Sequence, residues 1–458
     1  MNHDTIAAAA TAMSSAGIGI IRISGEDAFT ILDRIFRSKN SEKKILEQPS
    51  YTIHYGMIYD GEELLDEVIV LLMKGPHSYT AEDTVEIDCH GGILVMRRIL
   101  ETVLKQGARP AEPGEFTKRA FLNGRIDLSQ AEAVMDVIQA KNQVALQASV
   151  SQLKGSVSEK IHCFREQLLY ETAFLESALD DPEHISLDGY GERLFKIVKE
   201  IDLKLEDLIN TFENGRIVKE GIKTVILGKP NAGKSSLLNA LLGEERAIVT
   251  DIAGTTRDIL EEQLYLDGVT LNILDTAGIR RTEDKVEQIG VSRAKEQADA
   301  ADLILYVVDS SCGLNENDEE ILELLQEKKG IILLNKSDLK TVVTEEMIRE
   351  KTDHPVISIS AKKGLGLKEL EETIRELFFQ GRVSFNDELV ITNVRHKAAL
   401  EEARKSLLMV ENSIELGMPE DFYTIDLMGA YSSLGLILGE EMGEDLVQEI
   451  FSKFCMGK

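Results

Sequence analysis

Apolar and polar residues alternate in short runs through the first 118 residues, at the two-residue spacing that is typical of β-strands. Strands are predicted over residues 19–23, 51–59, 67–73 and 84–88. Helices are predicted over residues 26–36 and 92–106, where apolar positions recur every three or four residues. This mixture of strands and helices predicts a small α+β domain over residues 1–118.

The spacing of apolar residues becomes helical near Arg119 and again after residue 382. The predicted buried positions include Leu128, Ala131, Met135, Ile138, Leu175, Leu179, Leu400, Ala403, Leu407 and Val410. Either flank alone would bury little surface. We therefore predict one discontinuous helical domain made of residues 119–214 and 383–458.

Residues 215–382, between the two helical flanks, alternate strand and helix patterns as a mainly parallel sheet requires. A hairpin turn is predicted at residues 266–269, which read Leu-Asp-Gly-Val. This segment is predicted to be a domain inserted into the helical one, because insertions are tolerated where chain ends lie close together.

Residues 228–235 read Gly-Lys-Pro-Asn-Ala-Gly-Lys-Ser and follow the apolar run 224–227. The spacing is that of a phosphate-binding loop between a strand and a helix. Its glycines allow the backbone to wrap a phosphate chain, and the N–H groups at a helix N-terminus favour the phosphate charge. Lys234 is expected to contact the β- and γ-phosphates, and Ser235 to bind Mg²⁺.

Three further motifs follow apolar runs, at residues 275–278 (Asp-Thr-Ala-Gly), 335–338 (Asn-Lys-Ser-Asp) and 360–362 (Ser-Ala-Lys). A carboxylate at Asp338 can accept from N1–H and the 2-amino group of guanine, a donor pair that adenine lacks. We therefore predict a Ras-like P-loop G domain that binds GTP and rejects ATP. The residues expected to bind GTP are Asn231, Ala232, Gly233, Lys234, Ser235, Ser236, Thr250, Asp251, Ile252, Ala253, Gly254, Thr255, Thr256, Asp275, Thr276, Ala277, Gly278, Asn335, Lys336, Asp338, Ser360, Ala361 and Lys362.

The position that follows the Asp-Thr-Ala-Gly motif is Ile279, where Ras-like proteins carry a glutamine that orients the attacking water. Either hydrolysis is negligible or another group positions the water. Glu283, Asp284 and Glu287 are the candidates, and each could equally be a solvated loop charge. The amide oxygen of Asn231 could face a monovalent cation beside the phosphates or simply cap the loop.

Composition narrows the function further. The chain has 458 residues and a formal net charge of −29, which opposes non-specific binding to nucleic-acid phosphates. Cys89, Cys163, Cys312 and Cys455 are scattered without a C-x-x-C pair, which fits a reducing cytoplasm. Because no apolar run approaches the ~20 residues of a membrane span, we expect no membrane association.

Further blocks of sequence lie outside the nucleotide motifs. They include GIGIIRISG at residues 17–25, GPHSYTAED at 75–83, HGG at 90–92, PGEFTKRAFLNG at 113–124, DLSQAE at 127–132 and FCMGK at 454–458. With these blocks the chain resembles, over its whole length, the MnmE (TrmE) family of bacterial tRNA-modification GTPases, within the TrmE-Era-EngA-like GTPases. The blocks make the resemblance specific, because many GTPases share the nucleotide motifs alone.

The resemblance implies a multidomain α/β architecture: an α+β N-terminal folate-binding and dimerisation domain, a discontinuous helical domain and an inserted G domain. It also implies a homodimer that forms a heterotetramer with the FAD-dependent partner MnmG (GidA). Together they would add an aminomethyl or carboxymethylaminomethyl group to C5 of the wobble uridine of certain tRNAs. A tetrahydrofolate derivative (5-formyl or 5,10-methylene) would occupy the folate site, and the methylene form would supply the carbon. In the family, G domains pair across the nucleotides and K⁺ acts in place of an arginine finger.

The resemblance also assigns roles to individual residues. In the G domain, K⁺ would be held by Asn231 with the backbones of Thr250, Ile252 and Thr255, Mg²⁺ by Ser235 and Thr256, and the attacking water by Glu287. The folate-binding positions would be Arg22, Glu86, Arg125 and Lys458. Arg125 stands where a relative carries lysine, and the two cations are not interchangeable. Cys455 matches a C-terminal cysteine implicated in modification, although a free cysteine is more often a small hydrophobic residue.

The nucleotide motifs alone fit equally well a GTP-switch or assembly GTPase with no direct role in modification chemistry, which predicts no folate binding. Residues 215–382 carry no redox or methyl-transfer constellation. We therefore expect the G domain to drive conformational change, while the chemistry takes place at the folate domain and the partner's flavin.

Overall fold

The computed structural model describes residues 4–39, 44–243, 262–266, 269–274, 298–326, 328–379, 390–440, 442–455 and 457. The chain divides into two compact units. The first comprises residues 1–138, 151–201 and 402–458, and the second comprises residues 139–150 and 202–401.

The first unit begins with a mixed sheet that has, within the described residues, seven strands in the order β3-β4-β5-β6-β2-β1-β7. The strands are β1 (Ile6–Ala9), β2 (Ile18–Ser24), β3 (Phe36–Ser38), β4 (Thr52–Asp60), β5 (Glu63–Met73), β6 (Thr84–His90) and β7 (Arg109–Pro110). Helices α1 (Ala28–Ile35) and α2 (Ile93–Lys105) pack on one face, where Ile21, Ile87 and Met96 share a core. The other face exposes apolar side chains, including Ile18, Ile53 and Ile69.

The strands and helices that the pattern predicts in this region are present, and three further strands were not predicted. Strand β1 lies in an alanine-rich run, which has a weak propensity for strands. It is held by pairing rather than propensity, antiparallel to β2 (Ile6 opposite Ser24) and parallel to β7. Strand β5 begins at Glu63, four residues before the predicted start at residue 67, because its pairing with β4 continues to their turn.

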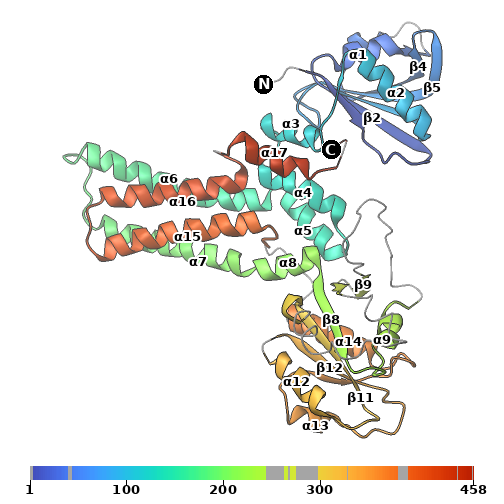
Figure 1. Cartoon of the computed structure of the whole chain (residues 1–458). Coiled ribbons are helices and arrows are strands. Elements are labelled where there is room, and N and C mark those ends of the chain that lie inside the picture. The colour runs from blue at the N-terminus through green and yellow to red at the C-terminus, as the bar shows by residue number, and fades with distance from the viewer. Residues whose placement is uncertain are drawn as a thin grey trace. The chain divides into compact units, whose positions relative to one another are not determined.

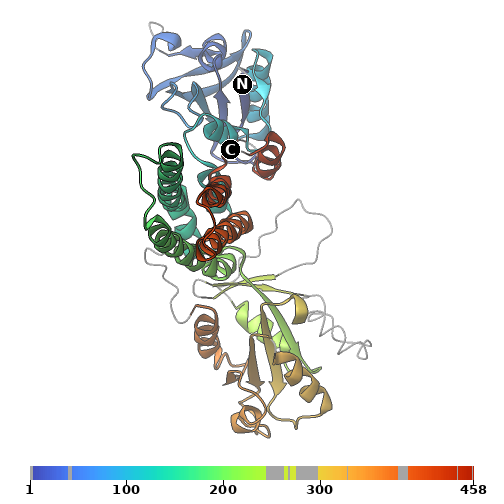
Figure 2. The same ribbon diagram turned by 90° about the vertical axis from the view of Figure 1, so that its left-hand side faces the viewer.

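Helices follow the sheet and return at the C-terminus. They are α3 (Glu115–Leu122), α4 (Leu128–Gln139), α5 (Gln143–Leu153), α6 (Ser156–Asp180), α7 (Tyr190–Asn210), α15 (Val394–Glu415), α16 (Asp421–Leu438) and α17 (Glu444–Ser452). Helices α6 and α16 run side by side (Figure 1), and Figure 2 looks along them. The Arg165 guanidinium on α6 binds both carboxylate oxygens of Glu440 at 2.5 Å and lies over the Tyr431 ring. Ile138 and Leu179, which we expected to be buried, are exposed.

The second unit contains a sheet that, in the described part of the chain, has six strands in the order β13-β12-β11-β8-β10-β9. They are β8 (Ile222–Gly228), β9 (Glu262–Leu266), β10 (Val269–Ile273), β11 (Leu303–Asp309), β12 (Gly330–Asn335) and β13 (Val356–Ser358). All pairs are parallel except β9 with β10. The predicted mainly parallel sheet is therefore confirmed, and the pairing of Val269 with Leu266 confirms the hairpin.

Helices cover both faces of this sheet, because alternate residues of its buried strands point to opposite sides. Helices α8 (Phe212–Glu220), α9 (Lys234–Leu241) and α14 (Leu367–Phe379) share a core with Ile226 and Leu333. On the other face, α12 (Glu316–Leu325) and α13 (Glu345–Arg349) share a core with Leu227 and Tyr306. Strands β8, β11 and β12 end at the same edge, where an open α/β sheet binds its ligands.

The first residues of α5 belong to the core of the second unit. Val144 and Ala145 are buried in the same cluster as α8 and β10. The side-chain oxygen of Asn142 accepts from the Ala145 N–H (2.7 Å). Its amide nitrogen donates to the Val218 carbonyl (3.1 Å) and to Thr270 Oγ1 (3.2 Å), so it ties the start of α5 to α8 and β10.

Candidate functional site

The phosphate loop forms where β8 ends and α9 begins, and two of its glycines are required by space and by backbone conformation. Gly228 has φ +149°, and a Cβ there would lie 2.3 Å from the Val307 carbonyl oxygen. Gly233 has φ +103°, and a Cβ there would lie 2.0 Å from Asn335 Nδ2. Only glycine fits both positions without displacing the neighbouring chain.

Lys234 is the first residue of α9, and its ammonium group lies inside the phosphate loop. It donates to the carbonyls of Gly228 (2.6 Å) and Lys229 (2.8 Å). Ser235 follows in the first turn of the helix, and the N–H groups at a helix N-terminus favour an anion. Asn231 has φ +63° and is exposed at the tip of the loop. The predicted phosphate-binding residues therefore lie together at a helix N-terminus.

Asn335, at the end of β12, joins the phosphate loop to the segment that was predicted to meet the base. Its side chain is 2 % exposed. The amide nitrogen donates to the Ala232 carbonyl (2.8 Å), and the amide oxygen accepts from the Ala361 N–H (3.0 Å). The Asn-Lys-Ser-Asp motif predicts Asn335 as a nucleotide contact but does not indicate this bridge. An amide at the end of a fully apolar strand is the signal that could have pointed to it.

The carboxylate of Asp338 is oriented by Ser360, whose hydroxyl donates to Oδ1 at 2.7 Å. This hydrogen bond holds the pKa of Asp338 below its ordinary value. Asp338 is therefore ionised at neutral pH, as an acceptor for the donor pair of guanine must be. Lys362 is exposed in the turn that follows Ala361.

Lys336 has φ +63°, and its ammonium group binds Asp309 Oδ2 at 2.5 Å. Burial alone would raise the pKa of Asp309, but hydrogen bonds from Lys336 and Ser311 outweigh it, and the pKa is lowered. Asp309, at the end of β11, thus fixes the side chain of Lys336, the lysine of the Asn-Lys-Ser-Asp motif at residues 335–338. The sequence motifs do not point to this residue.

Several predicted site residues lie outside the described residues: Thr250, Asp251, Ile252, Ala253, Gly254, Thr255, Thr256, Asp275, Thr276, Ala277, Gly278, Glu287 and Lys458. Their roles stay predictions. Ser236 lies on α9 beside Ser235, and its side chain is exposed.

A second group of predicted residues lies around the Tyr79 ring in the first unit. Arg22 on β2 pairs with Glu86, directly opposite on β6, through contacts of 2.8 and 2.7 Å. The guanidinium carbons of Arg22 and Arg125 lie 5.2 and 4.7 Å from the centre of the Tyr79 ring. Arg22 also donates to the carbonyl of Gly457 at 3.2 Å. Three of the four predicted folate-binding residues therefore converge, and Tyr79 is a member that sequence analysis did not name as a site residue.

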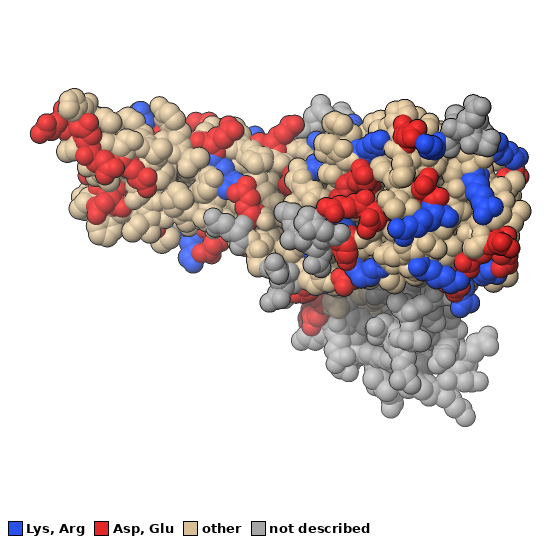
Figure 3. Space-filling model, turned by 90° about the horizontal axis from the view of Figure 1, so that it is seen from above, with Lys and Arg blue, Asp and Glu red and all other residues tan. Residues whose placement is uncertain are grey.

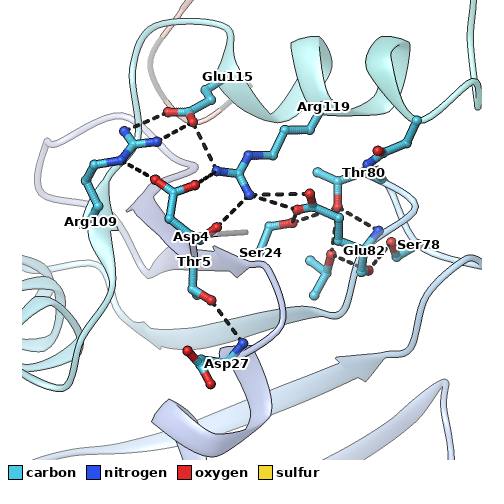
Figure 4. Close-up of polar contacts among 12 residues, drawn as sticks. Asp4, Thr5, Ser24, Asp27, Ser78, Thr80, Glu82, Arg109, Glu115 and Arg119 are labelled. Atoms are coloured by element: carbon cyan, nitrogen blue, oxygen red, sulfur yellow. Dashed lines mark hydrogen bonds and ion pairs between the residues drawn. The ribbon is translucent and has the colours of Figure 1, made fainter. Parts of the chain in front are cut away.

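An ion-pair network fixes α3 against the sheet (Figure 4). Arg119 donates to Asp4 (2.7 Å), Glu115 (3.2 Å) and Glu82 (3.1 Å), and Arg109 binds Asp4 and Glu115 from the other side. The Arg119 and Glu115 side chains are buried, so each charge depends on its partners.

The network sets the position of the residues that surround Tyr79. From α3, Thr117 shares a hydrogen bond with the Tyr79 hydroxyl (2.8 Å), and the Phe116 ring lies 5.6 Å from the Arg22 guanidinium carbon. Arg125 follows α3 by a short turn. The geometry of this site therefore depends on charges that lie behind it.

The C-terminal residues lie against α3 and β1. The Gly114 N–H donates to the Cys455 carbonyl (3.3 Å), and a Cβ at Gly457 would lie 2.3 Å from the Ala9 carbonyl oxygen. This close packing places Gly457, the residue before Lys458, next to Arg22. The side chain of Cys455 is exposed.

A mainly parallel sheet with a glycine-rich phosphate loop, an Asn-Lys-x-Asp segment and a Ser-Ala-Lys segment at its strand ends defines a guanine-nucleotide-binding P-loop domain. Two family models match the chain: the MnmE helical domain over residues 128–455, and the N-terminus of GTP-binding protein TrmE over residues 5–125.

Curated relatives match along the whole chain. A tRNA modification GTPase MnmE of Lachnoclostridium phytofermentans is 59 % identical over 458 residues, covering 100 % of both chains. One of Acetivibrio thermocellus is 50 % identical over 462 aligned residues, covering 100 % of this chain and 99 % of the relative. The chain belongs to the MnmE family of GTPases.

Among solved structures, the chain is similar to the G domain of the T. maritima FeoB iron transporter. The two are 28 % identical, and the match covers 34 % of this chain and 98 % of that one. The TM-score is 0.27, too low to bear on the architecture. Among the described residues, no helix has the length and apolar character that crossing a membrane requires.

Proposed function

We propose that this chain is the GTP-hydrolysing component of the complex that modifies the wobble uridine of certain tRNAs. With the FAD-dependent partner MnmG, it adds an aminomethyl or carboxymethylaminomethyl group at C5 of the uridine, using a one-carbon unit carried by tetrahydrofolate. The observation that carries the proposal is the pairing, on one chain, of guanine-nucleotide loops with a separate cluster of Arg22, Tyr79, Glu86 and Arg125.

The residues around Tyr79 fit a folate in their chemistry. A pterin ring offers N–H donors that a carboxylate such as Glu86 accepts, and a flat surface that stacks on an aromatic ring. The glutamate tail of a folate is anionic, and guanidinium groups such as Arg22 and Arg125 pair with carboxylates. Lys458 would add a further cation.

The nucleotide site fits Mg²⁺ and K⁺ as far as it is described. Ser235 would hold Mg²⁺ together with Thr256. The exposed amide of Asn231 would hold K⁺ with the backbones of Thr250, Ile252 and Thr255, where the ion offsets charge that grows in the transition state. Glu287 would orient the attacking water.

GTPase activity tests the cation directly. We expect turnover in potassium buffer to exceed turnover in sodium buffer by on the order of 10³-fold, by analogy with an arginine finger. Equal rates in the two salts would remove K⁺ from the proposal. Glu287→Ala should lose hydrolysis and keep GTP affinity, whereas retained turnover would transfer the role to Glu283 or Asp284.

The open face of the N-terminal sheet supports a homodimer. Ile18, Ile53 and Ile69 are 62, 66 and 42 % exposed on this face. Apolar side chains gathered on a sheet face are more typical of an interface than of a surface in water. We propose that two copies meet here.

The distribution of charged side chains on the surface bears on where tRNA binds. Figure 3 shows Asp and Glu side chains gathered at the end of the long helices where α6 leads into α7, and Lys and Arg mainly over the N-terminal sheet. Asp180, Asp181 and Glu183 are exposed at that acidic end. Phosphates are repelled there, so we propose that tRNA binds elsewhere, in the cytoplasm and with the help of the partner.

Mass spectrometry of the wobble uridine in tRNA from cells lacking this chain tests the proposal. We expect the aminomethyl and carboxymethylaminomethyl groups to disappear. An unchanged profile, together with no binding of 5-formyl-tetrahydrofolate to the purified chain, would instead support a GTP-switch or assembly GTPase.

A further inference from the structure

The side chain of Lys229, the second residue of the phosphate loop, forms an ion pair with a residue of helix α12. Its ammonium group pairs with Asp318 Oδ2 near the start of α12. Asp318 is 1 % exposed. Its other carboxylate oxygen accepts from the hydroxyl of Tyr306 at 2.5 Å, and Tyr306, on β11, is itself fully buried. A chain of three side chains thus runs from the core of the sheet to the loop.

A buried carboxylate is costly unless its charge is paired and its oxygens are hydrogen-bonded. Tyr306 and the Asn315 N–H (2.8 Å) satisfy the hydrogen bonds of Asp318, but neither carries a charge. Among the contacts described for Asp318, the positive charge comes from Lys229. The ion pair therefore holds the side chain of Lys229 at a fixed point outside the loop.

The backbone of Lys229 acts on the other side. Its carbonyl accepts from the ammonium group of Lys234 at 2.8 Å, beside the carbonyl of Gly228. The residue that Asp318 holds is therefore also one that contacts the phosphate-binding lysine. A shift of Lys229 moves this carbonyl and the loop N–H groups that follow it.

We propose that Asp318 is a positioning residue for the nucleotide: through Lys229 it fixes the phosphate loop in the conformation that receives the phosphates. The inference depends only on nucleotide binding at this loop and not on the tRNA chemistry or the folate site. Asp318 touches neither nucleotide nor metal in this role. Because the loop surrounds the phosphates that GDP and GTP share, Asp318 governs the affinity for both nucleotides.

A purely structural role makes a different prediction. Asp318 also completes a capping box at the N-terminus of α12, in which its N–H pairs with Asn315 Oδ1 and its carboxylate with the Asn315 N–H. A cap alone stabilises the helix and has no effect on the loop. Asn315→Ala therefore provides a matched control, because it removes the side-chain half of the same cap and leaves Lys229 in place.

The test is fluorescence titration of the full chain with N-methylanthraniloyl GTP and GDP, together with steady-state GTPase kinetics and melting curves. Asp318→Asn and Lys229→Met should each weaken binding of both nucleotides about tenfold and lower kcat/KM for GTP by at least as much. The double variant should be no weaker than the single ones, because the two residues act as one unit. Lys229→Arg should restore most of the affinity.

Asn315→Ala should lower Tm while leaving nucleotide affinity unchanged. Tyr306→Phe removes the donor to Asp318 and keeps the buried ring. It therefore tests the same series of contacts, from Tyr306 through Asp318 to Lys229, if Asp318→Asn does not fold. Wild-type affinity in Asp318→Asn, additive losses in the double variant, or an equal loss in Asn315→Ala would each overturn the proposal.

Discussion

The two candidate sites of this chain are built in different ways. The nucleotide loops consist of short contiguous segments at the ends of parallel strands, and much of their chemistry lies in backbone N–H groups and in glycines that permit it. The site around Tyr79 is assembled from single side chains on β2, β6, α3 and the loops beside them. The first is local in sequence, and the second exists only in the folded domain.

The difference explains what each site tolerates. A loop whose function lies in the backbone is sensitive to residues that fix its conformation, such as Asn335 and the two glycines. A site made of charged side chains is sensitive to the pairs that hold them, such as Arg22 with Glu86 and the network behind α3. The substitutions below test this contrast.

Lys234→Ala should have the largest effect. The ammonium group lies in the phosphate loop, and its removal takes away the charge that is predicted to stabilise the transferred phosphate. We expect the GTPase rate to fall at least about 100-fold. Exposed Lys340 gives the control, since Lys340→Ala should retain the wild-type rate. Unimpaired folate binding in Lys234→Ala would confirm that the two sites are independent, and a loss at both would remove the contrast.

Asp338→Asn should change the preferred base. The amide offers a donor where guanine presents one, whereas xanthine carries a carbonyl in place of the 2-amino group. We expect GTP affinity to fall about 50-fold, the worth of a hydrogen bond to a charged group, while affinity for xanthosine triphosphate rises. Competition titration measures both. The exposed carboxylate of Asp353 is the control, and similar behaviour of Asp353→Asn would contradict a specific role for Asp338.

Glu115→Gln should lower the free energy of local unfolding of the N-terminal sheet by about 2 kcal/mol at pH 7. Burial alone would raise the pKa of Glu115, but the hydrogen bond from Arg109 and the nearby charges lower it below the ordinary 4.5. The lowered pKa means that the charge stabilises the fold above about pH 4.5 and that this contribution is lost as pH falls through the folded value. The deficit of the variant should therefore shrink towards pH 3.5.

Hydrogen exchange of the amides in residues 4–118, corrected for intrinsic rates, measures this local stability. Glu112, three residues away and exposed, gives the control variant Glu112→Gln. A deficit that stays constant from pH 7 to pH 3.5 would show that the charge of Glu115 is not its source.

Arg22→Lys should have the smallest effect. Lysine keeps the charge but lacks the planar guanidinium group, whose nitrogens contact Glu86 and the Gly457 carbonyl at the same time. We expect binding of 5-formyl-tetrahydrofolate to weaken about five- to tenfold, the worth of one net hydrogen bond, with GTPase activity unchanged. Calorimetry measures the affinity, and exposed Arg34→Lys should bind as the wild type does.

Much of the fold was predictable because its elements have strong local patterns. Strands β11 and β12 of the second sheet are nearly continuous apolar runs, and the loops that follow the strands carry motifs whose spacing follows from phosphate and guanine chemistry. The exceptions have physical reasons. Strand β1 is alanine-rich and is held by its neighbours. Ile138 and Leu179 are the next-to-last residues of α4 and α6, where a helix end has fewer neighbours to cover it.

The candidate sites were predictable to different degrees for the same reason. Residue patterns alone identified the phosphate loop and the two segments that are predicted to contact the base, residues 335–338 and 360–362. They did not identify Asp309, Asp318 or Tyr79, because partners such as these are set by tertiary contacts that no short motif encodes. Arg22, Glu86 and Arg125 came from family resemblance rather than from spacing.

The anchor at Asn142 has a mechanical consequence. Thr270, which it contacts, lies on β10, the strand that leads towards the Asp-Thr-Ala-Gly motif at residues 275–278. An 11-residue helix begins one residue after this anchor and extends for about 16 Å without a flexible joint. A displacement of β10 would therefore also move the start of α5, because Asn142 joins the two.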